Sequence, residues 1–160
     1  MKRLWAPWRM AWIRAAKAPP GCIFCDARST DDDRARFVLT RGAHAFLLLN
    51  AFPYASGHVM AAVNRHVGPV TDARVDELAD AMELVQRAIV ALGTEYRPDG
   101  YNIGINQGRA AGAGIEDHLH IHVVPRWNGD SNFMPVVGEV RVLPETLDRT
   151  WERLRSRLGG

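Results

Sequence analysis

The sequence predicts one globular domain that combines short antiparallel strands with two amphipathic helices. Three observations predict it: the size and composition of the chain, a series of short apolar runs separated by turn residues, and two longer stretches with helical spacing. The chain has 160 residues, of which 47% are hydrophobic. This is enough for one sizeable core and too little for two independent domains.

The charge balance excludes several classes of protein. The 20 basic and 18 acidic residues give a net charge of +2, too even for a general nucleic-acid or membrane binder. We find no apolar run long enough to cross a bilayer and no signal-peptide pattern, so we expect a cytoplasmic protein with no membrane partner. Two cysteines three positions apart do not make a disulfide scaffold.

Four short apolar runs predict the strands. They lie at 37–39, 44–49, 58–63 and 101–106, and their turn-rich connections, such as 50–57, suit antiparallel neighbours. The fourth run leads into the glycine-rich stretch that precedes the histidine-rich strand described below.

A long helix is predicted after Thr71 or Asp72, either of which can cap it, and Gly93 is expected to end it. Its apolar positions are Val75, Leu78, Ala79, Met82, Val85, Ile89 and Leu92. We expect Met82 to be an ordinary residue of the core. A weak strand is expected at 136–142. A last helix opens at Pro144-Glu145, and its apolar face consists of Leu147, Trp151, Leu154 and Leu158.

The N-terminal residues form a basic, tryptophan-rich arm. Residues 1–17 carry five lysines and arginines, no acid, and three tryptophans at spacings of three and four. Such an arm can stack on nucleic acid or lie at a membrane interface. Because indoles bury large apolar areas, we favour the interpretation that they cover a patch of the domain or of a second subunit.

Cys22 and Cys25 form a Cys-x-x-Cys pair after a Pro-Pro-Gly break and before a polar run, 26–36, that we interpret as a loop. The pair can bind zinc, work as a redox dithiol, or be two reduced buried thiols. A thioredoxin-type dithiol needs a helix that opens at the pair, so zinc is favoured. The missing ligands must then come from histidine or carboxylate side chains.

Three histidines at alternate positions are the main candidates for chemistry. In a strand His118, His120 and His122 share one face, and the other face carries Leu119, Ile121 and Val123. The imidazoles can bind metal, attack phosphorus as nucleophiles, or form a plain polar face. Their strict register, with Arg126 nearby and a glycine-rich loop before them, favours chemistry.

The glycine-rich loop at 107–114 matches neither nucleotide-binding fingerprint. It has no Gly-Lys-Ser/Thr sequence, and it joins two predicted strands instead of opening a helix. Considered alone, it is either a flexible hairpin loop or an anion-binding loop. Its place directly before the three imidazoles favours anion binding.

The segment His118-Leu-His-Ile-His-Val-Val resembles the His-x-His-x-His-x-x signature of the histidine-triad (HIT) superfamily of nucleotidyl hydrolases and transferases. The resemblance extends over most of 36–142, and the 4–9 and 128–133 segments are similar to the bacterial branch that includes diadenosine tetraphosphate phosphorylases and relatives of the fragile-histidine-triad hydrolases. It implies an α+β fold with a five-stranded antiparallel sheet, one long central helix and a C-terminal helix, usually as a homodimer. Residues 1–160 would be a single HIT domain with an arm at 1–20, a core at 36–142 and a helix at 144–158.

The resemblance also implies a reaction and a site. His120 would attack an α-phosphorus and form a nucleotidyl-histidine that water or phosphate resolves, while His118 and His122 orient it and manage protons. No catalytic metal is implied. The implied substrate contacts are the side chain of Asn50 on the ribose, that of Asn106 on the phosphate, and the backbone at Gly112, Ala113 and Gly114.

Zinc-containing relatives imply a structural zinc ion, and the corresponding ligands here are Cys22, Cys25, His66 and His118. The expected function is cleavage of dinucleoside polyphosphates or related nucleoside 5′-phosphate derivatives. The alternative is a nucleotide-binding signalling module with incidental phosphoramidase-type activity. No specific nucleic-acid binding is expected.

Overall fold

The computed structural model describes residues 21–130 and 144–159, and in these residues five strands form one antiparallel sheet in the order β1-β2-β3-β5-β4. The strands are β1 (Val38–Arg41), β2 (Ala45–Leu49), β3 (Val59–Val63), β4 (Gly100–Gly104) and β5 (His120–Arg126). The helices are α2 (Ile23–Ser29), α3 (Val75–Tyr96) and α5 (Leu147–Leu158), with short 3-10 turns η1 (Val70–Asp72) and η2 (Arg109–Ala111).

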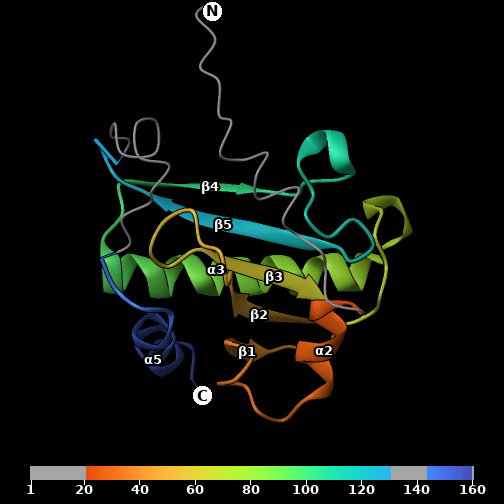
Figure 1. Ribbon diagram of the computed structural model, residues 1–160, viewed down its shortest axis with the longest axis horizontal. Helices are drawn as coiled ribbons and strands as arrows, with labels where there is room; N and C mark the ends of the chain where they lie inside the picture. The colour runs from red at the N-terminus through yellow and green to blue at the C-terminus, as the bar shows by residue number, and fades with distance from the viewer. Residues whose placement is uncertain (1–20, 131–143, 160) are drawn as a thin grey trace, which may run out of the picture.

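The helices cover the sheet unequally. Helix α3 runs across one face, α5 lies beside α3 near β1, and α2 lies at the β1 and β2 end of the opposite face (Figure 1). This arrangement confirms the predicted α+β fold with a five-stranded sheet, a long helix and a C-terminal helix. All four short apolar runs form strands, with bounds that differ from the predicted ones by a residue or two.

Two apolar clusters lie on the two faces of the sheet. The larger one joins the sheet to α3 and α5 and includes Leu119, Ile121 and Val123 of the histidine-rich segment. The smaller one lies under α2, and its buried members are Phe24, Ala27, Val38, Phe46, Leu48, Met60 and Ala62. Because β2 and β3 lie between the two clusters, every residue in them is buried.

Helix α3 differs from its prediction at both ends and on its inner face. It begins after Arg74, whose backbone N–H donates to Glu77 at 2.8 Å, and it continues past Gly93 to Tyr96. Gly93 does not end the helix because Arg97, in the left-handed conformation at φ 46°, does. The cap prediction of Thr71 or Asp72 was wrong, since both lie in η1.

The predicted apolar stripe of α3 was also partly wrong. Val75 is 84% exposed and Met82 is 46% exposed, so Met82 is not core filler. The buried face instead consists of Glu77, Ala81, Leu84, Val85, Ala88, Ala91 and Leu92. Several small alanines let the helix lie close to the sheet, and spacing alone did not distinguish that face from the neighbouring one.

Two further boundaries are corrections. The residues after Cys22 form α2, not a loop, because Phe24 and Ala27 bury themselves against the sheet. The last helix begins at Leu147 instead of Pro144, with the Thr146 side chain accepting a hydrogen bond from the Arg149 N–H at 3.3 Å. The tryptophan-rich arm and the strand predicted at 136–142 lie outside the described residues. In the described part of the chain, no helix is long and apolar enough to span a membrane.

Candidate active site and metal site

The three histidines of the signature lie on the face of the sheet opposite α3. His120 and His122 belong to β5 and His118 lies just before it, while the intervening Leu119 and Ile121 are buried in the core under α3. The alternation predicted from the sequence is therefore confirmed. His118 and His120 are buried, and His122 is partly accessible.

The hydrogen bonds of His118 assign its two ring nitrogens. Its Nε2 lies 2.7 Å from the carbonyl oxygen of Val63. Because a carbonyl oxygen only accepts, Nε2 carries the proton and the Nδ1 lone pair is free. That Nδ1 lies 3.2 Å from the Cys22 sulfur and 3.6 Å from the Cys25 sulfur. Burial also lowers the pKa of His118, which favours the neutral form that a metal ligand needs.

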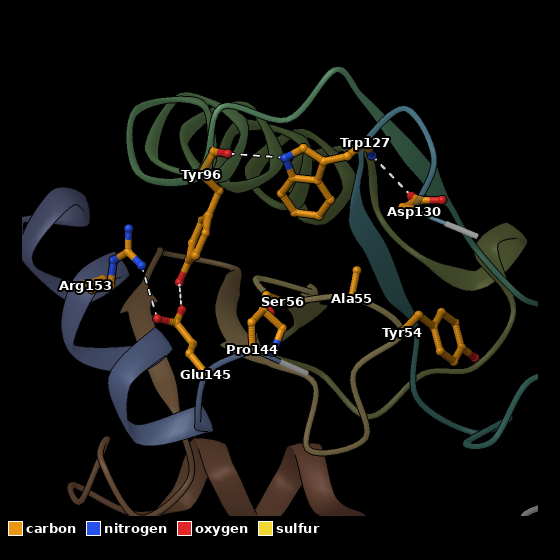
Figure 2. Close-up of a pocket in the computed structure, with 9 residues that line it drawn as sticks. All are labelled: Tyr54, Ala55, Ser56, Tyr96, Trp127, Asp130, Pro144, Glu145 and Arg153. Carbon is orange, nitrogen blue, oxygen red and sulfur yellow. Dashed lines mark hydrogen bonds and ion pairs between the residues drawn. The ribbon is translucent and has the colours of Figure 1, made fainter. Parts of the chain in front are cut away.

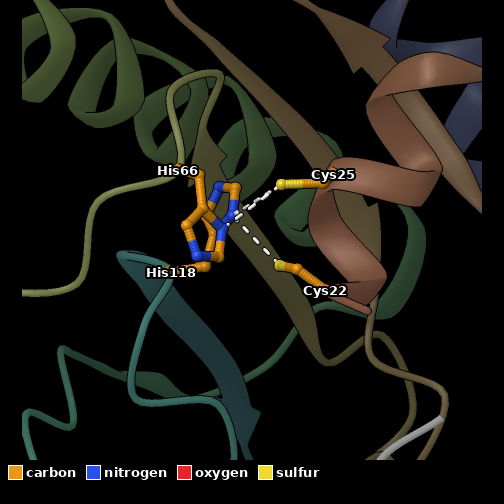
Figure 3. A group of neighbouring side chains, drawn as sticks. All are labelled: Cys22, Cys25, His66 and His118. Carbon is orange, nitrogen blue, oxygen red and sulfur yellow. Dashed lines mark hydrogen bonds between the residues drawn. The ribbon is translucent and has the colours of Figure 1, made fainter. Parts of the chain in front are cut away.

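Four side chains from three separate segments meet at this point (Figure 3). Cys22 and Cys25 come from the start of α2, His66 from the loop after β3, and His118 from the approach to β5. Their ligand atoms all lie within 4.8 Å of one another, and the His66 Nδ1 is 3.3 Å from the Cys25 sulfur. The cluster predicted from the sequence is thus assembled in the structure.

The donor set of this cluster fits zinc. Two sulfurs and two imidazole nitrogens are a common tetrahedral ligand set for zinc, and nitrogen-to-sulfur separations of 3.2 to 3.6 Å allow each atom to face a common centre. Burial raises the pKa of the Cys25 thiol, and the neighbouring Cys22 sulfur raises it further. A divalent cation supplies the charge that would favour the thiolate forms.

His120 is held by the backbone of the same strand. Its Nδ1 lies 2.7 Å from the carbonyl oxygen of His118, so Nδ1 carries the proton and Nε2 carries the lone pair. Burial lowers the pKa of His120. The ring is therefore neutral near pH 7, with Nε2 as its basic, potentially nucleophilic atom.

A fourth histidine, His58, completes the site and was not assigned a role from the sequence. The backbone N–H of Tyr54 donates to its Nδ1 at 3.1 Å, so the His58 proton lies on Nε2. That Nε2 donates to the Nδ1 of His122 at 2.9 Å, which leaves the proton of neutral His122 on its own Nε2. Burial, assisted by His120, lowers the pKa of His122 to about 4.

The sequence did carry a signal for His58. It lies at an even spacing before Met60 and Ala62, on the face of the third strand that carries the smaller apolar cluster. Two strands with histidines on the same face predict that the imidazoles can meet if the strands pair. The pairing of β3 with β5 was the missing information.

The two asparagines lie at the ends of strands near the histidines. Asn50 follows β2, and its side-chain nitrogen is 3.4 Å from the Nδ1 of His58 while its side-chain oxygen accepts from the Phe52 N–H at 2.9 Å. Asn106 lies two residues beyond the end of β4, whose last residue, Gly104, pairs with His122. Asn50 thus lies beside His58, and Asn106 follows the strand that pairs with β5.

The glycine-rich loop joins β4 to β5, as predicted, and contains η2. The Gly112 N–H donates to the Arg109 carbonyl at 2.9 Å, and the Ala113 N–H donates to the Gly108 carbonyl at 3.3 Å. Within the described chain the Gly114 N–H has no such acceptor. Of the three residues predicted to face a phosphate, Gly114 is therefore the one whose backbone N–H has no acceptor among the described residues.

The pocket shown in Figure 2 is separate from the histidines, apart from Tyr54 at its edge. It has a volume of ≈ 440 Å³, and the Tyr54 ring centroid lies 4.8 Å from that of His58. Tyr96 donates to Glu145 in its wall, and Arg153 binds Glu145 at 3.1 Å and Glu95 at 3.0 Å. This network anchors α5 to the end of α3.

Comparison with known proteins agrees with this geometry. The family model described as the HIT domain matches residues 33–129, and the chain belongs to this family of histidine-triad proteins. It is 36% identical over 158 residues to a protein named AP-4-A phosphorylase from Mycobacterium tuberculosis, covering 94% of this chain and 80% of the relative.

Two further relatives show the range of the family. The chain is 26% identical over 137 residues to the adenosine 5′-monophosphoramidase hnt1 of Schizosaccharomyces pombe, covering 86% of this chain and 98% of the relative. Among solved structures, a zinc-bound histidine triad family protein from Mycobacterium smegmatis superimposes with a TM-score of 0.69 at 27% identity, covering 86% of this chain and 93% of that one.

Proposed function

We propose that this chain cleaves dinucleoside polyphosphates, or related nucleoside 5′-phosphate derivatives, through a covalent nucleotidyl-histidine at His120. The observation that carries the proposal is the bond from the His120 Nδ1 to the His118 carbonyl, which leaves Nε2 as a fixed, buried lone pair. The chain is an enzyme of the HIT nucleotide hydrolase or phosphorylase type, and the named relatives support activity on nucleotides.

The proposed reaction has two displacements at the α-phosphorus. In the first, the lone pair of His120 Nε2 forms a nitrogen-phosphorus bond while the bond to the leaving phosphate oxygen breaks. That oxygen leaves as a phosphate anion, and the Nε2–H of His122 would donate a hydrogen bond to it. In the second, water or inorganic phosphate attacks the phosphorus, and the bond to His120 breaks with its electron pair returning to Nε2. When water is the attacking group, the proton that it loses passes to the solvent. Water gives a nucleoside monophosphate, and phosphate gives a nucleoside diphosphate.

The substrate contacts in the proposal follow the residues predicted from the sequence. Asn50 would contact the ribose and Asn106 the phosphate. Backbone N–H groups of the loop at Gly112, Ala113 and Gly114 would stabilise the charge that builds on the phosphoryl oxygens. Gly114, whose N–H has no acceptor among the described residues, is the leading donor. The loop must rearrange before Gly112 and Ala113 can donate.

We assign a structural role to zinc at Cys22, Cys25, His66 and His118. With four protein ligands a tetrahedral zinc ion has no open position for substrate, and the proposed displacement uses imidazole nitrogens only. His118 would then be a ligand that also anchors His120 through its carbonyl oxygen. The zinc-bound structure from Mycobacterium smegmatis supports this assignment.

Assembly and location complete the proposal. The outer edge of β4 has no partner strand in the described chain, and Ile103 on it is 47% exposed. An apolar free edge favours pairing with a second copy, so we propose a homodimer. The two free cysteines fit a reducing compartment such as the cytoplasm.

The test is incubation of the purified protein with diadenosine tetraphosphate, with and without inorganic phosphate. ADP that forms only with phosphate identifies a phosphorylase, and AMP with ATP in plain buffer identifies a hydrolase. Turnover must disappear in His120→Ala. Tight nucleotide binding without turnover in the unmodified protein would contradict the proposal and favour the nucleotide-binding signalling module.

A further inference from the structure

Phe24 lies between the metal-binding cysteines and the proposed nucleophile. It sits on α2, between Cys22 and Cys25 in the sequence, and is 0% exposed. Its ring centroid is 4.8 Å from that of His120 and 5.1 Å from that of His118, with interplanar angles of 37° and 47°. The phenyl ring therefore contacts two histidines of the signature at once.

We propose that Phe24 is a positioning residue that holds the His120 ring in its reactive orientation and makes that orientation depend on the metal site. The inference rests on the proposed role of His120 as nucleophile. Phe24 itself contacts no reacting atom in this scheme, because it acts through the imidazole that it packs against.

One hydrogen bond does not fix an imidazole. The bond from His120 Nδ1 to the His118 carbonyl restrains one edge of the ring but permits rotation about the line of the bond. His122 lies edge-on to His120, with ring centroids 4.8 Å apart and an interplanar angle of 76°. With Phe24 as a further aromatic contact, the ring is held by two aromatic neighbours as well as by one hydrogen bond.

The position of Phe24 depends on the first turn of α2, because the hydrogen bonds from Arg41 hold only the C-terminal end of this helix, at the carbonyl oxygens of 27, 28 and 30. The helix has seven residues, which is far too short to be stable by itself. Its buried residues are Phe24 and Ala27, and a metal bound by Cys22 and Cys25 would tie its first turn to His66 and His118. Loss of the metal should therefore loosen the first turn of α2, and Phe24 would transmit this change to His120.

Phe46 provides a matched control. It is also 0% exposed, belongs to the same apolar cluster, and lies on β2 on the same face of the sheet. The described structure gives it no ring contact with a histidine. Phe24→Leu and Phe46→Leu therefore remove the same side-chain volume from one cluster, and only the first removes the ring contact with His120.

The experiment compares the metal-loaded variants with diadenosine tetraphosphate as substrate. We expect Phe24→Leu to lower kcat roughly 10-fold or more with little change in KM, because small misplacements of a reacting group are costly. Phe46→Leu should keep the kcat of the unmodified protein. If both variants lower kcat equally, or if Phe24→Leu changes KM alone, the proposal is overturned.

A second readout does not need activity. The proton shared by His120 Nδ1 and the His118 carbonyl should give a slowly exchanging downfield imidazole N–H resonance in proton NMR. We expect chelation of the metal to weaken this resonance in the unmodified protein and in Phe46→Leu. Phe24→Leu should weaken it with metal still bound, at an unchanged metal content of one ion per chain. A resonance that persists in Phe24→Leu would overturn the proposal.

Phe24→Met keeps most of the side-chain volume but lacks the flat ring. This variant replaces Phe24→Leu in the experiment if the leucine variant does not fold. It should reproduce the loss of the resonance. Chelation should also lower kcat by a smaller factor in the Phe24 variants than in Phe46→Leu, because the coupling is already broken. If chelation lowered kcat by the same factor in all of these variants, the proposed coupling between the metal site and His120 through Phe24 would be overturned. Absence of turnover in the unmodified protein would instead refute the proposed function, and the NMR readout would still test Phe24.

Discussion

At the scale of single residues, the three histidines of the signature are not equivalent, and backbone groups make them different. The Val63 carbonyl turns the His118 lone pair toward two sulfurs, and the His118 carbonyl leaves the His120 lone pair on Nε2. The Tyr54 N–H acts through His58 to place the His122 proton on Nε2. Each tautomer follows from one backbone contact.

The shared face of these histidines could be predicted from the sequence, because strand side chains alternate with a period of two. The tautomers could not. Val63 and Tyr54 are brought to their histidines by the pairing of β3 with β5 and by the loop before β3, and sequence spacing contains neither contact. The resemblance to the family implied that the three histidines have different roles. It did not show that backbone contacts set their tautomers.

The first prediction concerns His58. In His58→Leu the Nδ1 of His122 loses its donor, so the His122 proton is no longer held on Nε2. We expect kcat for diadenosine tetraphosphate to fall on the order of 100-fold, the usual cost of losing one hydrogen-bond donor to developing charge. His44→Asn is the control, since His44 is a partly exposed histidine whose Nε2 lies 3.6 Å from a carboxylate oxygen of Asp76. Unchanged kcat in His58→Leu would refute the role of His58 in holding the His122 proton on Nε2.

At the scale of secondary structure elements, α2 shows where sequence reasoning failed and why. A proline-rich break before it and aspartates after it favoured a loop, and local propensity alone supports that interpretation. The helix forms because Phe24 and Ala27 bury against the sheet, a tertiary contact that outweighs local preference. The inner face of α3 was misplaced for a similar reason, since the sheet selects which of two neighbouring stripes is buried.

The second prediction concerns the metal site at the start of α2. Cys25→Ser removes one thiolate of a four-ligand set, so we expect metal content to fall well below one ion per chain and the melting temperature to drop. Metal analysis and thermal unfolding check this. Ser29→Ala, on the same helix but outside the cluster, should keep the full metal content. If protein purified without a chelator contains no zinc, the proposed zinc site is refuted.

At the scale of the whole molecule, the architecture was more predictable than the site. Four of five strands, the long helix and the C-terminal helix follow from apolar spacing and turn residues, and the fifth strand follows from the histidine alternation. The strand order does not follow from spacing, because β5 inserts between β3 and β4. That insertion brings His122 to His58 and His118 to the cysteines, so the site depends on it.

The third prediction concerns the stability of the whole fold against pH. The pKa of His122 is lowered to about 4 in the folded state, against about 6.5 in the unfolded chain. Below pH 6.5 the unfolded chain therefore binds a proton that the folded chain does not, and the free energy of unfolding falls as the pH drops from 6.5 to about 4. Glu77, with a pKa lowered to about 2, contributes only below about pH 4.5.

After allowance for the partial exposure of His122, we expect this loss to be on the order of 2 kcal/mol. Urea unfolding of the metal-loaded protein at pH 7 and pH 5 measures the larger part of it. His122→Asn should make the decline between these pH values shallower, whereas His44→Asn should leave it as it is. The buried His120, whose pKa is also lowered, contributes to the decline that remains. An equal decline in the His122 variant would show that another group is responsible.

The most direct test of the central claim is to trap the covalent intermediate. The protein is mixed with diadenosine tetraphosphate, quenched in base, where phosphoramidates persist, and digested for mass spectrometry. The account predicts one adenylate on His120, formed at least as fast as turnover and absent in His120→Ala. Turnover without an adduct, or an adduct on another residue that persists in His120→Ala, would contradict it.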